Sequence, residues 1–88
     1  MRNYMKKLLP AFICGETMNT ATASVRNGIF YSYATPIAKI SQDEKSVFLV
    51  EKYFSRTTNS QQKAIREFCE NHGLEIVKVS FESFKKYL

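Results

Sequence analysis

Between Phe54 and Asn59 the chain changes from one pattern of apolar residues to another, and this change most limits the fold that it can adopt. Residues 47–50 before it form a consecutive apolar run, which is typical of a core strand. After it, apolar residues recur at helical spacing: Ala64, Ile65, Phe68 and Cys69. Strands that precede one main helix favour an α+β fold, in which Ile65 and Phe68 pack the helix on one face of a sheet.

The main helix is predicted over about 59–72, within a segment spanning residues 58–73. Thr58 is the expected N-cap, and Gln61 three places later completes a capping box. Gly73 suits the C′ position, where a left-handed backbone is common, and Leu74 supplies the apolar contact that follows.

Residues 21–54 are predicted to form a small antiparallel β-meander, in a sheet of three to four strands. Asn27-Gly28 lies between two β-forming segments and favours a type I′ hairpin turn, because both central residues need positive φ. Thr35-Pro36 interrupts the return strand. Since proline cannot donate to a ladder, this strand lies at an edge or carries a bulge.

The two ends complete a predicted single domain over residues 1–88. Residues 74–88 are expected to add a strand and a short C-terminal helix. Residues 1–20 are expected to form an N-terminal arm or a short helix, because Pro10 disfavours a long one. A charged start followed by a short apolar run also resembles a signal peptide, but that run is too short and too interrupted to be typical.

The chain carries 13 Lys and Arg against 8 Asp and Glu, a formal charge of +5. On a chain of 88 residues this excess attracts phosphate backbones or an acidic protein surface, although it can also serve solubility alone. The longest basic run is two residues, so any basic patch has to be assembled by folding.

Catalysis and cofactor binding are not expected from these residues. Cys14, Cys69 and the sole histidine, His72, cannot assemble a zinc site from Cys and His alone, and we expect no metal and no cofactor. Asp43 is the only aspartate and lies in an exposed turn, and no apolar pocket is implied around the pair Asp43-Glu44 that would separate the pKa values of two carboxyls. Two free thiols fit a reducing, cytoplasmic setting, and no segment approaches the length of a membrane span.

Two segments, YSYATPIAKI (31–40) and YFSRTTNSQQKAI (53–65), resemble an uncharacterised family of small proteins of bacteriophages and mobile elements. That family reads approximately SYGTPIA, then a short strand, then YSxTTSxHQ. The matching positions are Tyr33, Thr35, Pro36, Ile37, Ala38, Tyr53, Ser55, Thr57, Thr58 and Gln62. Ala34 replaces a glycine of the pattern, Phe54 is inserted, and Gln61 stands where the pattern has histidine. The resemblance implies an origin in phage or mobile DNA, and the family supplies no activity to carry over to this chain.

Two groups of side chains could form a binding site. Ser55, Arg56, Thr57 and Thr58 at the helix start could hold a phosphate with a cation, hydroxyls and backbone N–H groups, although capping by Thr58 explains most of the same residues.

The second group is aromatic. Tyr31, Tyr33 and Phe30, with Arg26 and Lys39 nearby, could form a stacking platform with phosphate contacts. Tyr31 and Tyr33 are expected to share one strand face while Phe30 points to the other, and one of these faces must supply the core.

Two functions from different classes follow. The first is a non-enzymatic protein that binds nucleic acid or a nucleoprotein complex through Arg26, Lys39, Lys52, Arg56, Lys63 and Arg66. The second is a phage-encoded, anti-CRISPR-like inhibitor that docks on an acidic host defence protein. The outer side of the helix, with Arg56, Lys63 and Arg66, is the expected binding surface, and the strand around Tyr31 and Tyr33 is the alternative. No membrane partner is expected, and a homodimer is left open.

Overall fold

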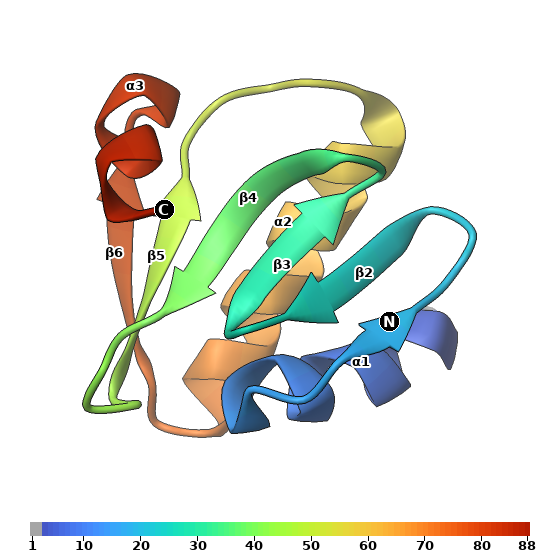
Figure 1. Cartoon of the computed structure of the whole chain (residues 1–88), viewed down its shortest axis with the longest axis horizontal. Helices are drawn as coiled ribbons and strands as arrows, with labels where there is room; N and C mark the ends of the chain where they lie inside the picture. The colour runs from blue at the N-terminus through green and yellow to red at the C-terminus, as the bar shows by residue number, and fades with distance from the viewer. Residues whose placement is uncertain (1–2) are drawn as a thin grey trace.

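The computed structural model describes residues 3–88, and one six-stranded sheet with strands in sequence order lies at its centre (Figure 1). Its strands are β1 (Met18–Asn19), β2 (Ala23–Arg26), β3 (Ile29–Ser32), β4 (Thr35–Ile40), β5 (Ser46–Val50) and β6 (Glu75–Val79). Neighbours from β1 to β5 are antiparallel, and β6 lies parallel to β5 after a helical crossover. The predicted α+β class is confirmed, but the predicted number of strands is too low.

The β2–β3 hairpin follows the predicted turn. Asn27 and Gly28 have φ of 52° and 74°, the left-handed values that a type I′ turn needs. Arg26 pairs with Ile29 across it. A Cβ added at Gly28 would lie 2.7 Å from the side chain of Ile40, so glycine fits this position for its size as well as its backbone.

Pro36 lies beside an irregularity, as proline in a strand should. The register between β3 and β4 shifts between Phe30 and Tyr31, because Phe30 pairs with Ala38 and Tyr31 pairs with Pro36. The pairing of β4 with β5 begins only at Ala38, so the segment around Pro36 lacks a ladder partner on that side. Both consequences expected of this proline, a bulge and a local edge, are present.

Two helices, α1 (Asn3–Cys14) and α2 (Arg56–Asn71), share the main core with one face of the sheet. In Figure 1, α2 lies behind the strands. Ile65 is fully buried, and the ring of Phe12 packs edge-on against Phe30 at 6.0 Å between centroids. The predicted packing of the main helix on one face is confirmed.

The N-terminal segment is a 12-residue helix, longer than an arm or short helix, and it contains Pro10. Pro10 is exposed, while Met5, Leu8 and Phe12 are buried. The apolar contacts of the buried side offset the one backbone hydrogen bond that proline removes. The signal-peptide-like pattern falls within α1, except for Arg2, which lies outside the described residues.

The C-terminal elements, α3 (Phe81–Phe84) and the 3-10 helix η1 (Lys85–Tyr87), lie against the opposite face of the sheet. Tyr87 stacks on Phe48, which alternates along β5 with the core residues Val47 and Leu49. Phe84 is fully buried outside the main core cluster. Leu88, at the end of this segment, is 53% exposed and does not share the burial of Phe84.

The C-terminal end of α2 agrees with its prediction. Gly73 has φ of 67°, and the backbone N–H of Leu74 donates to the carbonyl of Cys69 at 2.9 Å. This is the Schellman arrangement, which turns the chain back towards β6.

Replacing Ile65 with Asp should unfold the protein, because it places an unpaired charge at a fully buried position. We expect a loss of at least about 3 kcal/mol in the free energy of unfolding, measured by urea denaturation with circular dichroism. The control is Glu67→Ala on the exposed side of the same helix, which should change stability little. An Ile65→Asp protein that melted like its parent would contradict this packing.

The two thiols should differ in reactivity. Cys69 is fully buried, and its burial raises the pKa of the thiol to about 11, whereas Cys14 is exposed. At pH 8 an alkylating reagent should therefore modify Cys14 and leave Cys69 unmodified until the chain is unfolded in urea. Peptide mass spectrometry measures both positions in the same sample. Equal labelling of both in the folded protein would contradict the placement of α2.

Candidate functional site

The start of α2 is capped by Ser55, not by Thr58 as the sequence predicts. The Ser55 hydroxyl accepts a hydrogen bond from the backbone N–H of Thr58 at 3.2 Å. Thr58 is 4% exposed, and its hydroxyl lies 2.7 Å from that of Ser32 on β3. Several residues here can cap a helix, and the burial of Thr58 against Ser32 decides which one does.

The predicted capping box is also absent. Gln61 is 1% exposed, and its amide nitrogen donates to the Tyr4 hydroxyl at 3.3 Å. Its amide oxygen has no partner within residues 3–88. The amide of Gln62 donates to the backbone carbonyls of Val50 and Lys52, at 2.9 and 3.1 Å. Both glutamines therefore anchor α2 to the rest of the protein.

These contacts weaken the case for a phosphate site at the helix start. The hydroxyls of Ser55 and Thr58 already bond to each other and to their neighbours. Arg56 is exposed and Thr57 half-buried, so only these two of the four predicted residues remain available. Capping explains the arrangement without a ligand.

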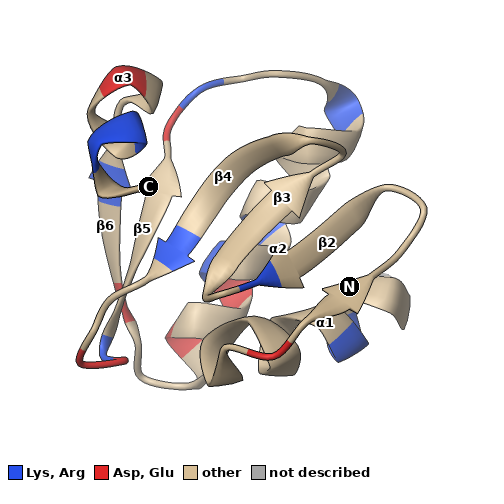
Figure 2. Cartoon of the chain, in the orientation of Figure 1, with Lys and Arg blue, Asp and Glu red and all other residues tan. Residues whose placement is uncertain are grey.

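The other cations predicted on this side lie on α2 or in the segment between β5 and α2. Lys52 and Arg66 line a shallow hollow of about 270 Å³, together with Asn59 and Gln62. Lys63 and Arg66 are exposed on α2. Glu67 follows Lys63 by four residues, and Glu70 follows Arg66 by four residues (Figure 2). Positive and negative charges therefore alternate on the outer side of the helix.

A different arrangement occupies the sheet face opposite α1 and α2, which we call the open face. On this face one row of cross-strand paired residues runs over β2, β3, β4 and β5. It consists of Arg26, Ile29, Lys39 and Phe48. The guanidinium carbon of Arg26 lies 4.4 Å from the centroid of the Tyr31 ring. None of these positions is acidic, so the cations here are not compensated by a neighbour in the row.

The three predicted platform aromatics separate in the structure. Phe30 is fully buried in the main core, whereas Tyr31 is half-buried on the open face. Tyr33 does not share that face as predicted, because it lies in the β3–β4 turn with φ of 55° and is 58% exposed. Period-two alternation therefore holds for Phe30 and Tyr31 and ends where the strand ends.

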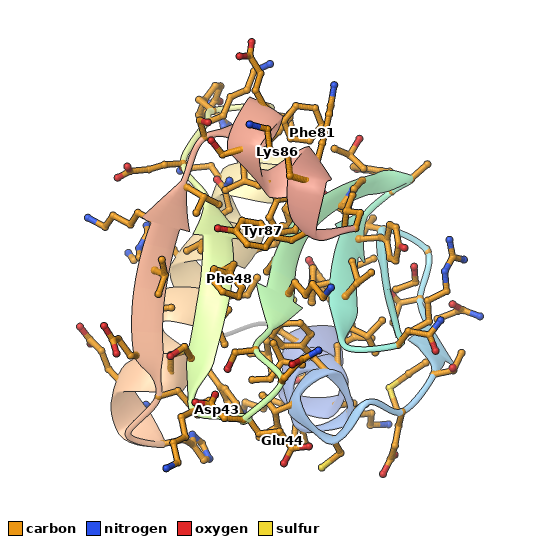
Figure 3. The ribbon with its side chains drawn as sticks, turned by 60° about the vertical axis from the view of Figure 1, so that its left-hand side comes forward. Asp43, Glu44, Phe48, Phe81, Lys86 and Tyr87 are labelled. Carbon is orange, nitrogen blue, oxygen red and sulfur yellow. The ribbon has the colours of Figure 1, made fainter. Side chains whose placement is uncertain are left out.

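The open face continues onto the C-terminal segment, which the sequence did not indicate. Tyr87 stacks on Phe48 with centroids 4.6 Å apart and planes at 14° (Figure 3). The ammonium of Lys39 donates to the backbone carbonyl of Tyr87. Lys85 lies 4.7 Å from the centroid of the Phe81 ring. The two contacts of Tyr87 join residues far apart in the chain, so no local spacing predicts them.

The charges at the two ends of the open face differ. In Figure 3, Lys86 and Phe81 lie at the α3 end, and Asp43 and Glu44 lie at the other end, in the β4–β5 turn. The Ser41 hydroxyl and the backbone N–H of Lys45 donate to Asp43 and hold the pKa of its carboxyl below the usual value. That end of the face stays negative at neutral pH.

Within residues 3–88 no group of three or more His, Cys, Asp or Glu side chains is placed to hold a metal ion. None of the helices among these residues is long and apolar enough to cross a membrane.

A family model described as a family of unknown function, DUF8033, matches residues 5–84. The match runs from within α1 to the end of α3. No curated protein and no solved structure matches the chain.

The Ser32–Thr58 pair should contribute to stability. Thr58→Val keeps the shape of the side chain but leaves the buried Ser32 hydroxyl without its partner, so we expect a loss of about 1–3 kcal/mol. Adding Ser32→Ala to this variant should recover part of the loss, because no buried hydroxyl is then left unpaired. Urea denaturation of the two single variants and the double variant measures this coupling. Strictly additive losses would mean that the hydroxyls do not interact.

Proposed function

We propose that this chain, which belongs to the DUF8033 family of unknown function, is a non-enzymatic protein that binds nucleic acid through its open face. The observation that supports this most is the Arg26 guanidinium over the Tyr31 ring, with Arg26 in the same row of paired residues as Lys39. Cations beside an exposed aromatic ring are what proteins use to contact phosphates and bases together.

The net charge supports the same partner. A formal charge of +5 on 88 residues attracts a polyanion over a distance comparable to the size of the molecule at low salt. Lys39 spends one of the three N–H donors of its ammonium on the Tyr87 carbonyl, which leaves two for a phosphate oxygen. Arg26 is exposed, and its guanidinium retains its N–H donors for a phosphate while it lies over the Tyr31 ring.

The open face is a better candidate than the outer side of α2, where the sequence analysis places the binding surface. On α2 a glutamate follows Lys63 and another follows Arg66, each one turn along the helix. A phosphate backbone laid along this helix would meet these carboxylates, whereas the row through Arg26 and Lys39 contains none.

We further propose that the protein acts in the cytoplasm of a bacterial host and originates from a phage or another mobile element. The support is the resemblance of residues 31–40 and 53–65 to small phage proteins, together with the free thiols.

A second candidate function is an anti-CRISPR-like inhibitor that docks on an acidic host defence protein. The observation in its favour is the position of β6 at the end of the strand order, where a five-residue strand has a neighbour on one side only. A pull-down from nuclease-treated host lysate separates the candidates: a protein partner that persists, and whose activity the chain inhibits, favours this one.

Two pairs of charge-removing substitutions can locate the binding surface. Arg26→Ala with Lys39→Ala removes two cations from the open face, and Arg56→Ala with Lys63→Ala removes two from α2. Because both variants lose the same net charge, the long-range field weakens equally. The open-face variant should lose about tenfold or more in affinity for a fluorescent 12-nucleotide strand, and its salt slope should fall by about 0.7 per lost contact.

Fluorescence anisotropy at several salt concentrations measures both quantities. Equal, small losses in the two variants would mean that only net charge matters. A larger loss in the α2 variant would return the binding surface to the helix.

A further inference from the structure

We infer that the ligand of the open face is a single strand, whose bases stack on two planar groups, the Arg26 guanidinium and the Tyr87 ring. This inference rests on the proposed function and adds the form of the nucleic acid and its position. It follows from the way the two groups are supported, from their spacing and from the charges between and around them.

Each planar group lies on the aromatic ring of a strand residue. The Arg26 guanidinium covers the Tyr31 ring at 4.4 Å, and the Tyr87 ring covers Phe48 nearly in parallel, at 14°. In both pairs the inner ring is half-buried and the outer group is exposed, Tyr87 to 44%. An exposed planar group on a fixed ring is suited to receive an unpaired base, because guanidinium and aromatic planes both stack on bases.

The spacing of the two groups suits a short stretch of nucleic acid. Arg26 on β2 and Phe48 on β5 lie in the same row, three strand spacings of about 4.8 Å apart, or roughly 14 Å. A stacked strand advances about 3.4 Å per nucleotide, and an unstacked one advances more. At most about four nucleotide steps therefore separate a base on Arg26 from a base on Tyr87.

Cations lie where the phosphates of such a strand would run. Lys39 lies between the two planar groups in the same row and bonds to the backbone of Tyr87. Lys85 and Lys86 immediately precede Tyr87 in η1. The Asp43 carboxylate and Glu44 occupy the opposite end of the face, so a polyanion is favoured on the α3 side and disfavoured beyond it.

A duplex cannot use these groups in the same way, because its base faces are covered by neighbouring pairs. It could only place phosphates near the lysines, which is a contact independent of the planar groups. Single strands should therefore bind more tightly than a duplex of the same length at the same salt.

The test compares a 12-nucleotide strand with its duplex, by fluorescence anisotropy at 100 mM salt, for four variants. Arg26→Lys keeps the charge but removes the guanidinium plane, and Tyr87→Ala removes the outer ring. The matched controls are Tyr87→Phe, which keeps a ring, and Lys63→Arg on α2, which changes one cation for another away from the site. Thermal melting of each variant verifies that the fold, including the buried Phe84, is retained.

We expect the single strand to bind at least tenfold more tightly than the duplex. Arg26→Lys and Tyr87→Ala should each weaken single-strand binding about fivefold or more and leave duplex binding nearly unchanged, because each removes one stacking partner of a base. Tyr87→Phe keeps the stacking ring and should restore most of the binding that Tyr87→Ala loses, and Lys63→Arg should bind like the parent. Shortening the strand from eight to two nucleotides should also weaken binding, because a single nucleotide step does not span the distance between the two planar groups.

Other outcomes overturn the inference in distinguishable ways. Equal binding of single strand and duplex, with Arg26→Lys neutral, would leave a general nucleic-acid binder and refute the stacking site. Tighter binding by Tyr87→Ala would show that residues 85–88 compete with the ligand for Phe48 and Lys39 instead of extending its site. No binding of either nucleic acid would refute the proposed function itself.

Discussion

The register of the β2–β3 hairpin is the constraint on which the rest of the structure depends. It sends Phe30 into the core against Phe12 and its neighbour Tyr31 to the open face beneath Arg26. Because side chains alternate with a period of two, a slip of one residue would bury Tyr31 and expose Phe30. The left-handed turn at Asn27-Gly28 fixes that register locally, so the core and the proposed binding surface are specified by one turn.

Local signals predicted the parts of the fold that local physics determines. The hairpin turn, the apolar stripe of α2 and its glycine C′ residue, Gly73, were all readable from spacing and residue type. The N-cap was not, because Ser55 and Thr58 can both cap a helix, and the burial of Thr58 against Ser32 leaves the cap to Ser55. The prediction of an N-terminal arm or short helix, drawn from Pro10, failed for a similar reason. The apolar contacts that stabilise α1 around Pro10 belong to the tertiary structure.

The candidate site likewise has a part that local sequence patterns predict and a part that they do not. Arg26, Tyr31 and Lys39 were predicted from an aromatic strand with nearby cations, and the structure brings these three to one face. The contribution of Phe48 and Tyr87 could not be predicted, because the Lys39–Tyr87 and Phe48–Tyr87 contacts each join positions nearly forty or more residues apart. No periodicity within a single element encodes a contact of that kind. Lys63 and Arg66 looked equivalent to Arg26 as cations, but each has a glutamate one turn along α2, whereas Arg26 lies over the Tyr31 ring.

The two faces of the sheet differ in their access to solvent, and this explains why the buried polar side chains concentrate on one of them. Between α2 and the sheet, Gln61, Gln62 and Thr58 are nearly inaccessible to solvent, and each directs a hydrogen bond at another element. Such bonds fix the orientation of a helix more than they stabilise it, because a misplaced helix would leave them unpaired. On the open face Phe84 is buried, but the contacts of Arg26, Lys39 and Tyr87 are stacks and a lysine–carbonyl bond, which solvent reaches. Contacts of that type rearrange at little cost, so these three residues can exchange their own contacts for those of a ligand.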